Sequence, residues 1–212
     1  MSNIQKCEYG ELPKSLGYPE VLEARKRELL LPHIAPLTQY VKDPRVKTGS
    51  KYDIPDFDPH DGGFHADCLF LLMMWSPKTA NTCFMSRDNP DETAKNIFLL
   101  MREAGIDRNR TVQWNIVPWI HRDETKISEV AKIELLVTEK PLSNLLALLP
   151  SPHTIVLVGG KATSQSEIVA SLAPEARICT ILHFSPSYIH QSPENREVLL
   201  EALRKIASGL PV

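Results

Sequence analysis

The feature that most constrains the fold is an alternation, repeated four times, of a short apolar run and a longer amphipathic segment. Continuous apolar runs of strand length are typical of strands buried on both faces of a parallel sheet. Cys68–Met74 is such a continuous run, and further strand-length segments are Thr111–Val117, Thr154–Val158 and Arg177–Leu182. Helical patterns follow them at 89–105, 127–149, 164–172 and 193–208. The alternation predicts an α/β fold of three α/β/α layers with a central, mainly parallel four-stranded sheet.

The first amphipathic segment has the clearest helix boundaries. Asn89-Pro90-Asp91-Glu92 combines a capping asparagine, a proline suited to a first turn and an acid three residues after the asparagine. Apolar residues then recur at helical spacing, and a glycine that can end the helix follows at Gly105. We therefore expect a helix that is capped by Asn89 and ends at Gly105.

The length of 212 residues fits one domain. We predict a single domain over 1–212, in which 1–66 forms a helical and irregular N-terminal extension packed on the sheet. Within it, 18–42 has a helical pattern that Pro32 and Pro36 interrupt, and 43–66 is rich in Pro, Asp, Gly and Lys, which indicates an irregular connection. No apolar run is long enough to cross a bilayer and no export signal is visible, so we expect a cytoplasmic monomer without membrane contact.

Cysteine and histidine spacing predicts neither a metal nor another cofactor. The four cysteines are too far apart for a zinc or iron–sulfur motif; they are Cys7, Cys68, Cys83 and Cys179. A loop rich in His and Asp, with His60, His65 and Asp67, leaves a metal-dependent phosphohydrolase or nuclease open as an alternative. Its spacing matches no metal motif, and Asp, Pro and Gly are also ordinary loop residues.

Chemically distinctive residues follow the end of each predicted strand. Ligands of such folds bind beyond the carboxyl ends of the strands. The first strand leads into Trp75-Ser76-Pro77-Lys78, and the second carries Asn115 near its end. The third leads into Gly159-Gly160-Lys161 and the fourth into His183-Phe184-Ser185-Pro186. We expect these four turns to surround one ligand site.

His183 and Asn115 carry the sharpest chemical signals. A histidine at a strand end can donate a hydrogen bond to an oxygen that gains negative charge as a bond breaks. The Asn115 carboxamide offers a donor and an acceptor, and so can read the edge of a base. Each also has an ordinary interpretation, as a surface histidine and as an asparagine satisfied by backbone groups. Phe84 is a candidate to stack on a planar ligand, although core packing is the commoner fate of a phenylalanine.

Together these segments resemble the uracil-DNA glycosylase superfamily over about residues 67–190. The apolar strand Leu69–Leu72 with its proline-bearing loop resembles the first motif, and Phe84 with Ser86-Arg87 resembles the loop that supplies a stacking phenylalanine. Trp114-Asn115-Ile116-Val117-Pro118 resembles the Asn-bearing strand, and His183-Phe184-Ser185-Pro186 resembles the final His-Pro-Ser-Pro motif. The resemblance implies an enzyme that flips a base out of DNA and cuts its N-glycosidic bond.

The resemblance also implies roles for individual residues. Phe84 would stack on the extruded base, Asn115 would read its Watson–Crick edge, and His183 would hold its 2-oxo group as the base leaves as an anion. Ser185 would grip a flanking phosphate, with Ser187 and Tyr188 near the wedge that fills the emptied stack. The other candidates lie in the turns after the strands. They are Met74, Trp75, Ser76, Gly159 and Gly160 for the base, and Lys78, Arg87 and Lys161 for DNA.

The first motif departs from the Gly-Glu-Ala-Pro-Gly form of the superfamily, because Leu72–Pro77 has no carboxylate or amide. Either Asp88 or Ser76 therefore positions the attacking water, or most of the catalysis comes from stabilisation of the leaving group. The departure leaves two substrates open, uracil and a bulky modified cytosine such as the glucosylated hydroxymethylcytosine of phage DNA. The corresponding functions are base-excision DNA repair and antiviral defence.

The net charge of −2 argues against a dedicated DNA binder unless basic residues gather locally. Six basic residues near the predicted turns are candidates for such a surface: Lys78, Arg87, Lys95, Arg108, Arg110 and Lys161. A non-catalytic nucleic-acid-binding module stays open as a third function, beside the glycosylase and the metal-dependent nuclease.

Overall fold

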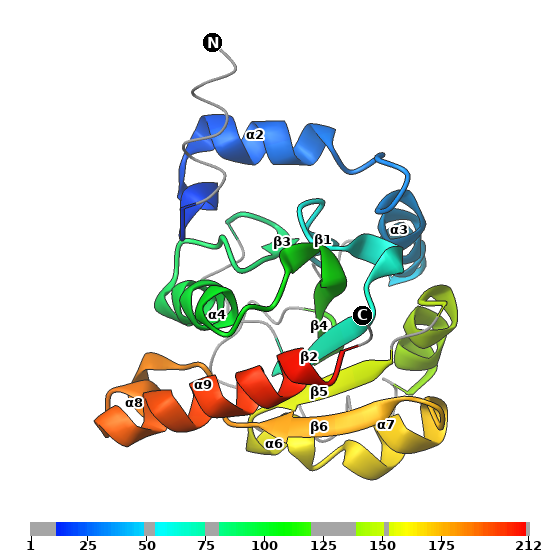
Figure 1. Ribbon diagram of the computed structural model, residues 1–212. Coiled ribbons are helices and arrows are strands. Elements are labelled where there is room, and N and C mark those ends of the chain that lie inside the picture. The colour runs from blue at the N-terminus through cyan, green and yellow to red at the C-terminus, as the bar shows by residue number, and fades with distance from the viewer. Residues whose placement is uncertain (1–11, 49–53, 75–80, 120–138, 151–152, 211–212) are drawn as a thin grey trace.

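The computed structural model describes residues 12–48, 54–74, 81–119, 139–150 and 153–210, and a parallel sheet lies at its centre (Figure 1). Its strands pair in the order β4–β2–β5–β6. They are β2 (Cys68–Met74), β4 (Thr111–Val117), β5 (Thr154–Val158) and β6 (Arg177–Ile181). Every pairing between them is parallel. The structure thus confirms the predicted α/β class and the four-stranded sheet.

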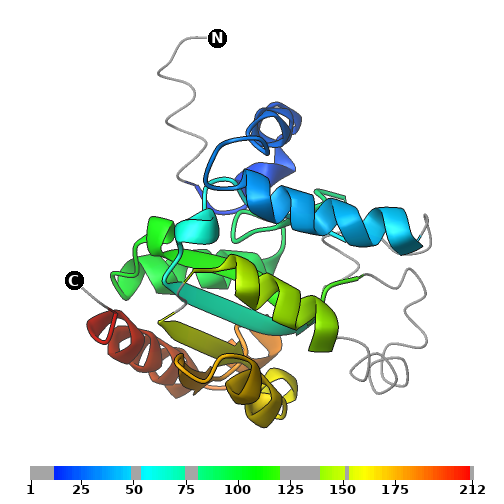
Figure 2. The ribbon, with the colours of Figure 1, turned by 90° about the vertical axis from the view of Figure 1, so that its right-hand side faces the viewer.

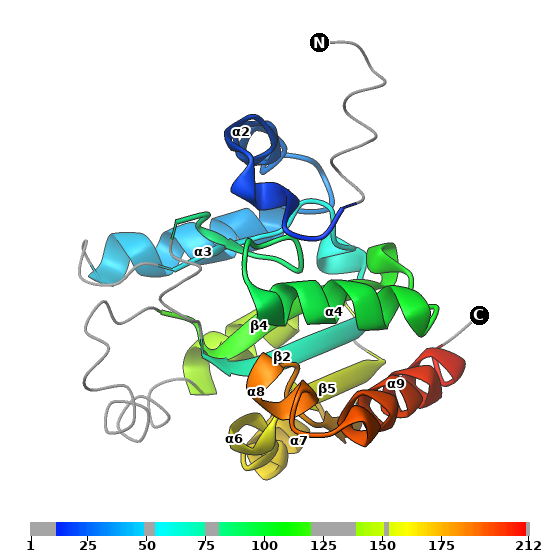
Figure 3. The ribbon, with the colours of Figure 1, turned by 90° about the vertical axis from the view of Figure 1, so that its left-hand side faces the viewer.

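Helices cover both faces of the sheet, which gives three layers. On one face, α4 (Glu92–Glu103) packs against α9 (Pro193–Ser208), and α4 lies in front of the sheet in Figure 3. On the opposite face lie α3 (Ala35–Thr48) and the helical residues 139–148, which Figure 2 shows. Shorter helices follow β5 and β6; they are α6 (Gly160–Thr163), α7 (Ser166–Leu172) and α8 (Pro186–Ile189). The first part of the helical pattern predicted at 127–149 lies outside the described residues.

The side chains of β4 alternate between the two faces, which decides where its polar residues lie. Trp114 points to the α3 face, where its ring stacks on Phe57 with centroids 3.8 Å apart and meets the edge of Tyr40 at 6.0 Å. Because successive side chains of a strand point to opposite faces, Gln113 and Asn115 point to the α4 face. Trp114 is 1% exposed, so this aromatic cluster fixes the register of the strand.

The N-terminal part has more regular structure than its sequence indicates. The helical pattern at 18–42 separates into α2 (Pro19–Arg27) and α3, and the break between them contains Pro32, as expected. The interruption expected at Pro36 is wrong, because Pro36 lies in the first turn of α3, where a proline is tolerated. The prediction of an irregular 43–66 is wrong in part. α3 continues to Thr48, and β1 (Asp56–Phe57) pairs in parallel with β3 (Phe84–Met85). Short 3-10 helices also occur, at η1 (Ser15–Gly17), η3 (Gly63–His65) and η5 (Arg108–Arg110).

The start of α4 differs from its prediction. Asp91 is the N-cap, and its side chain accepts a hydrogen bond from the Ala94 N–H at 3.0 Å. Asn89 instead donates to the Phe84 carbonyl oxygen at 2.8 Å and accepts from the Thr82 hydroxyl. Asparagine and aspartate cap helices equally well, so tertiary contacts of Asn89 decide between them. The helix ends as predicted, since Gly105 follows it with a φ of 73°.

Among the helices in the described ranges, none has the length and apolar character needed to cross a membrane.

Candidate functional site

A cavity of about 530 Å³ lies between the carboxyl-terminal halves of β2 and β4 and the start of α4. Its lining includes side chains from separate elements: Leu72 and Met74 of β2, Gln113 and Asn115 of β4, Met85 of β3, Ile97 of α4, and His183 after β6. Pockets that bind small ligands usually measure roughly 300–1,000 Å³. The fold therefore brings His183 and Asn115 to the wall of one cavity of ligand size.

Two buried carboxamides of β4 carry unpaired groups at this cavity. Gln113 and Asn115 are 1% and 2% exposed. Asn115 Nδ2 donates to Met85 Sδ at 3.5 Å, a weak bond, whereas Asn115 Oδ1 and Gln113 Nε2 have no hydrogen-bond partner among the described residues. A buried polar group without a partner costs about 1–3 kcal/mol. Two such groups in one cavity indicate a place where a ligand completes the hydrogen bonding.

Gln113 is not among the site residues predicted from the sequence. The signal that identifies it is the period of a strand, because a residue two positions before Asn115 shares its face. A glutamine in an otherwise apolar run is as unusual as the asparagine that was singled out.

The turn after β6 holds the His183 ring in one tautomer. The backbone N–H of Ser185 donates to His183 Nδ1 at 3.1 Å, so Nδ1 is unprotonated. In a neutral ring the proton is then on Nε2. Burial lowers the pKa of His183 below its ordinary value of 6.5, which favours the neutral ring at neutral pH. The cavity wall therefore contains a neutral imidazole with Nε2–H as its donor.

Gly159 allows β5 to approach this ring closely. Its φ is 82°, a conformation that other residues rarely adopt. A Cβ on Gly159 would lie 3.1 Å from His183 Cδ2 and 3.2 Å from His183 Cβ. A Cβ on Gly160 would meet nothing within 4 Å. Neither glycine is part of the cavity lining, so Gly159 acts on the site by positioning His183, and Gly160 lies away from it.

Charged side chains lie at the part of the cavity formed by the start of α4. Asp91 and Glu92 contribute to its lining, together with Lys14 from the N-terminal segment. Lys14 forms an ion pair with Glu92, which also pairs with Lys95 at 3.4 Å. Asp91 is thus a carboxylate of the cavity that no ion pair in the described structure engages. The sequence analysis treated it only as part of a helix start.

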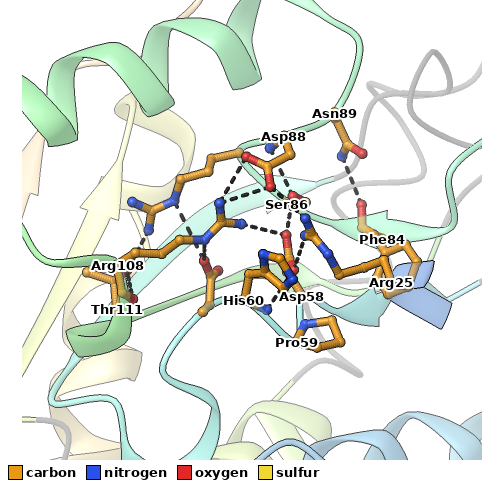
Figure 4. A network of polar contacts seen from close by, with 12 residues as sticks. Arg25, Asp58, Pro59, His60, Phe84, Ser86, Asp88, Asn89, Arg108 and Thr111 are labelled. Atoms are coloured by element: carbon orange, nitrogen blue, oxygen red, sulfur yellow. Dashed lines mark hydrogen bonds and ion pairs between the residues drawn. The ribbon is translucent and has the colours of Figure 1, made fainter. Parts of the chain in front are cut away.

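A buried charge network lies beside the cavity (Figure 4). Asp58 accepts hydrogen bonds from Arg25, Ser86 and Arg108, and Arg108 also donates to both oxygens of Asp88 at 2.9 and 3.0 Å. Arg25 lies 3.1 Å from Asp88 as well. We use the name charge network for the six residues Arg25, Asp58, Asp61, Arg87, Asp88 and Arg108. They come from α2, the loop after β1, the β3–α4 connection and η5, so the network ties the N-terminal helix to the sheet.

Burial and ion pairing have opposite effects on the pKa values of Asp58 and Asp61 in this network. Burial by itself raises the pKa of Asp58, but Arg25 and Arg108 outweigh it and hold that pKa well below its ordinary value. At Asp61 burial prevails and raises the pKa to about 6, although Arg87 and Arg108 favour the charged carboxylate. Asp61 Oδ2 also lacks a hydrogen-bond partner in the described part of the chain.

Two predicted functional residues belong to the charge network and not to the cavity lining. Asp88 has no exposed surface and is held by two arginines, which contradicts its predicted role in positioning water. Arg87 is 4% exposed, donates to the Thr111 hydroxyl and lies 3.6 Å from Asp61. Its guanidinium therefore cannot reach a DNA phosphate, and that prediction is also wrong. In both cases the loop position suggested exposure, whereas the loop is buried by α2 and η5.

The predicted stacking residue is not at the cavity either. Phe84 is 1% exposed within β3 and does not line the cavity, whereas its neighbour Met85 does. Because adjacent strand residues point to opposite sides, a shift of one residue exchanges the two. The structure thus places a methionine where the sequence analysis expected an aromatic ring.

The other candidates are placed as follows. Met74 lines the cavity. Ser185, Ser187 and Tyr188 lie in and just before α8, beside His183, and Ser187 Oγ donates to Ser185 Oγ at 3.1 Å. Lys161 is exposed on α6. Trp75, Ser76 and Lys78 lie outside the described residues.

Fewer basic residues are available for a DNA-binding surface than the six in the sequence suggest. Arg87 and Arg108 belong to the charge network. Arg110 pairs with Asp67 and Lys95 pairs with Glu92, so four of the six candidates have acidic partners.

The histidines and acids of the loop after β1 do not form a metal site. His60 Nε2 lies 2.9 Å from Glu28, the His65 ring packs on Phe64, and Asp67 pairs with Arg110. Across the residues that the structure describes, no group of three or more His, Cys, Asp or Glu side chains could hold a metal ion.

Comparison with protein-family models gives no match for this chain, and comparison with curated proteins gives none either.

Proposed function

We propose that this protein is a monofunctional DNA glycosylase, which flips a pyrimidine into the cavity and hydrolyses its N-glycosidic bond to leave an abasic site. The observation that carries the proposal is the pairing, in one cavity, of a neutral histidine with two buried, unsatisfied carboxamides. The resemblance of the strand-end motifs to the uracil-DNA glycosylase superfamily supports the same reaction.

The proposed chemistry stabilises the leaving group. Asn115 would bond the edge of the flipped base, and His183 Nε2–H would donate to its 2-oxo group as negative charge collects there. A donor fixed in advance is most effective where charge develops, and removing one such donor typically lowers kcat about 10²–10³-fold. A neutral ring donates this bond without first having to lose or gain a proton.

Asp91 takes the place of Asp88 as the candidate to position water. It is a carboxylate in the cavity lining, and its Oδ1 is held by the Ala94 N–H at the start of α4. That bond leaves the other oxygen, Oδ2, to accept a hydrogen bond from water.

The substrate base is uracil or a bulky modified cytosine, such as glucosylated hydroxymethylcytosine. The volume of about 530 Å³ favours the larger base, since pockets of this size hold drug-sized ligands and an unsubstituted pyrimidine would leave part of the space empty. Removal of a modified cytosine would act in antiviral defence, and removal of uracil would act in base-excision repair.

DNA binding would rely on a small set of groups near the cavity. We propose that Ser185, Ser187 and Tyr188 contact the backbone beside the flipped base, with Lys14 of the cavity lining and the exposed Lys161 of α6 as cations. The cytoplasmic, monomeric state expected from the sequence stays part of this proposal. With few cations at the site, affinity should be modest and its salt dependence shallow.

The experiment that tests the proposal presents oligonucleotides containing uracil, cytosine, 5-hydroxymethylcytosine or glucosylated hydroxymethylcytosine, and modified phage DNA. Alkali-labile abasic sites are then measured in single-stranded and double-stranded forms. We expect abasic sites on at least one modified or deaminated base, and a loss of at least about 100-fold in His183→Ala and Asn115→Ala.

The same assay separates the two rival functions. A metal-dependent nuclease would break strands without alkali and would stop in excess EDTA. A non-catalytic binding module would bind DNA and release it intact. Near-normal rates in both His183→Ala and Asn115→Ala would contradict the proposed site.

A further inference from the structure

Gln113 helps to identify the cavity as a ligand site, but the proposed mechanism gives it no contact with the base. It is 1% exposed, lines the cavity and leaves Nε2 without a hydrogen-bond partner among the described residues. Phe70, its register partner on β2, is apolar, and so are Leu72 and Ile97 of the cavity lining, so the amide lies in an apolar part of the wall. Keeping an unpaired donor there is unfavourable unless a ligand pairs with it.

We infer that Gln113 is a specificity-determining residue, whose Nε2–H donates to an oxygen on the edge of the flipped base furthest from the sugar. This inference rests on the proposed function. Gln113 lies two residues before Asn115, which places it about 6–7 Å deeper along β4 from the carboxyl edge of the sheet. Because the base enters over that edge, Gln113 faces the end of the ring opposite its bond to the sugar.

The two unpaired groups define a complementary pattern on the base. Asn115 Oδ1 requires a donor, such as a ring N–H or an amine. Gln113 Nε2 requires an acceptor further in. In a pyrimidine the distal acceptor is an oxygen at position 4, or an oxygen carried by a substituent at position 5. Unmodified cytosine and 5-methylcytosine lack both, so Gln113 disfavours these two bases; thymine has an oxygen at position 4 and is not excluded by Gln113.

Two substrate pairs that differ at a single atom test this inference. 5-Hydroxymethylcytosine differs from 5-methylcytosine by one oxygen at position 5, and uracil differs from 4-thiouracil at position 4. Excision rates, and dissociation constants for the oligonucleotides, are measured for wild type, Gln113→Met and Gln113→Leu. Methionine keeps the length of the side chain, and both substitutions remove the N–H donor. Gln165→Met, at a glutamine outside the cavity, is the matched control.

We expect wild type to favour the oxygen-bearing member of at least one pair by roughly 5- to 150-fold, the range for leaving a buried donor unpaired. Both Gln113 variants should reduce that ratio to about one, and Gln165→Met should leave it unchanged. A structural role alone would lower both members of a pair equally and leave the ratio intact, which would overturn the inference. A preference of wild type for the member without oxygen would overturn it as well.

The two readouts separate this inference from the proposed function. Absence of excision in wild type on every base would contradict the glycosylase, while discrimination in binding would still report on Gln113. Excision with an unchanged ratio in the Gln113 variants would contradict the inference and leave the glycosylase standing. Melting temperatures of all variants show whether each is folded.

Discussion

The backbone N–H of Ser185 and the Nδ1 atom of His183 are 3.1 Å apart, and this hydrogen bond decides the chemistry that the histidine can perform. A backbone N–H always donates, so Nδ1 must accept and the ring proton must be on Nε2. Burial lowers the pKa of the ring at the same time. The site is therefore arranged for a neutral donor and not for an imidazolium acid.

This arrangement predicts the dependence of the rate on pH. Since the pKa of His183 lies below 6.5, the ring is already neutral at pH 7 and has no proton to lose at higher pH. We expect kcat/KM to stay constant from about pH 7 to pH 9, and to fall at lower pH as protonation of Nδ1 breaks the bond to Ser185. A steady loss of kcat/KM between pH 6 and pH 8 would instead show that the charged ring is the active form.

Gly159→Ala should lower activity by displacing His183. The new Cβ would lie 3.1 Å from His183 Cδ2 in a backbone conformation that disfavours alanine, so the ring or the strand end must move. A displacement of about 1 Å at a catalytic group can lower the rate about 100-fold. Gly160→Ala is the matched control, because its Cβ meets nothing within 4 Å and alanine favours a helix. Equal rates in the two variants, measured as kcat on the best substrate, would argue against positioning by Gly159.

The variant Asp91→Asn distinguishes the role of Asp91 in positioning water from its role as the N-cap of α4. Asparagine caps a helix as well as aspartate does, so the melting temperature should change little. The loss of the carboxylate should lower kcat about 10²–10⁴-fold with little change in KM, as expected for loss of a general base. Asp88→Asn, in the charge network, should instead lower the melting temperature. If Asp91→Asn has wild-type kcat, another group positions the water.

Asp58 and Asp61 should differ in how their substitution affects stability. Asp58→Asn removes a carboxylate that Arg25 and Arg108 hold ionised, and should destabilise the protein by about 3–5 kcal/mol at pH 7. The stability that Asp58 contributes is present above its ordinary pKa of 3.8, and is lost as the pH falls below that value.

The sign is opposite at Asp61, whose pKa rises from 3.8 to about 6 on folding. The folded protein then binds the Asp61 proton more tightly than the unfolded chain does. The contribution of Asp61 to the free energy of unfolding therefore falls as the pH rises from about 4 to about 6. Asp61→Asn mimics the protonated form. Relative to wild type, its free energy of unfolding should increase by up to about 1.4 kcal/mol per pH unit across that window and level off above it. Urea unfolding at several pH values measures this difference, and a constant difference would contradict the raised pKa.

The sheet could be predicted because each strand is visible in the sequence as a mainly apolar segment of strand length. Cys68–Met74 is a continuous apolar run, Thr111–Val117 and Thr154–Val158 are mainly apolar, and the structure has strands with these bounds. Their parallel order follows from the helical segments between them. His183 and Asn115 could be located for the same reason, since the carboxyl ends of parallel strands meet at one edge.

The charge network could not be predicted, because its members are distributed from Arg25 to Arg108 and no spacing rule relates them. Arg87 and Asp88 therefore resembled exposed loop residues, and only the packing of α2 and η5 shows that they are buried. The exchange of Phe84 for Met85 at the cavity has a different cause. β3 is two residues long, too short for its alternation to indicate which side chain faces the site.

The proposed reaction breaks an N-glycosidic bond without a metal ion, and mass spectrometry of the released base measures it most directly. Wild type is incubated in excess EDTA with the oligonucleotides described above, and the supernatant and the strands are analysed before any alkali treatment. We predict a free pyrimidine in solution together with an intact strand that has lost that base. Nucleotides or broken strands without free base, or no release from any member of the panel, would contradict the account.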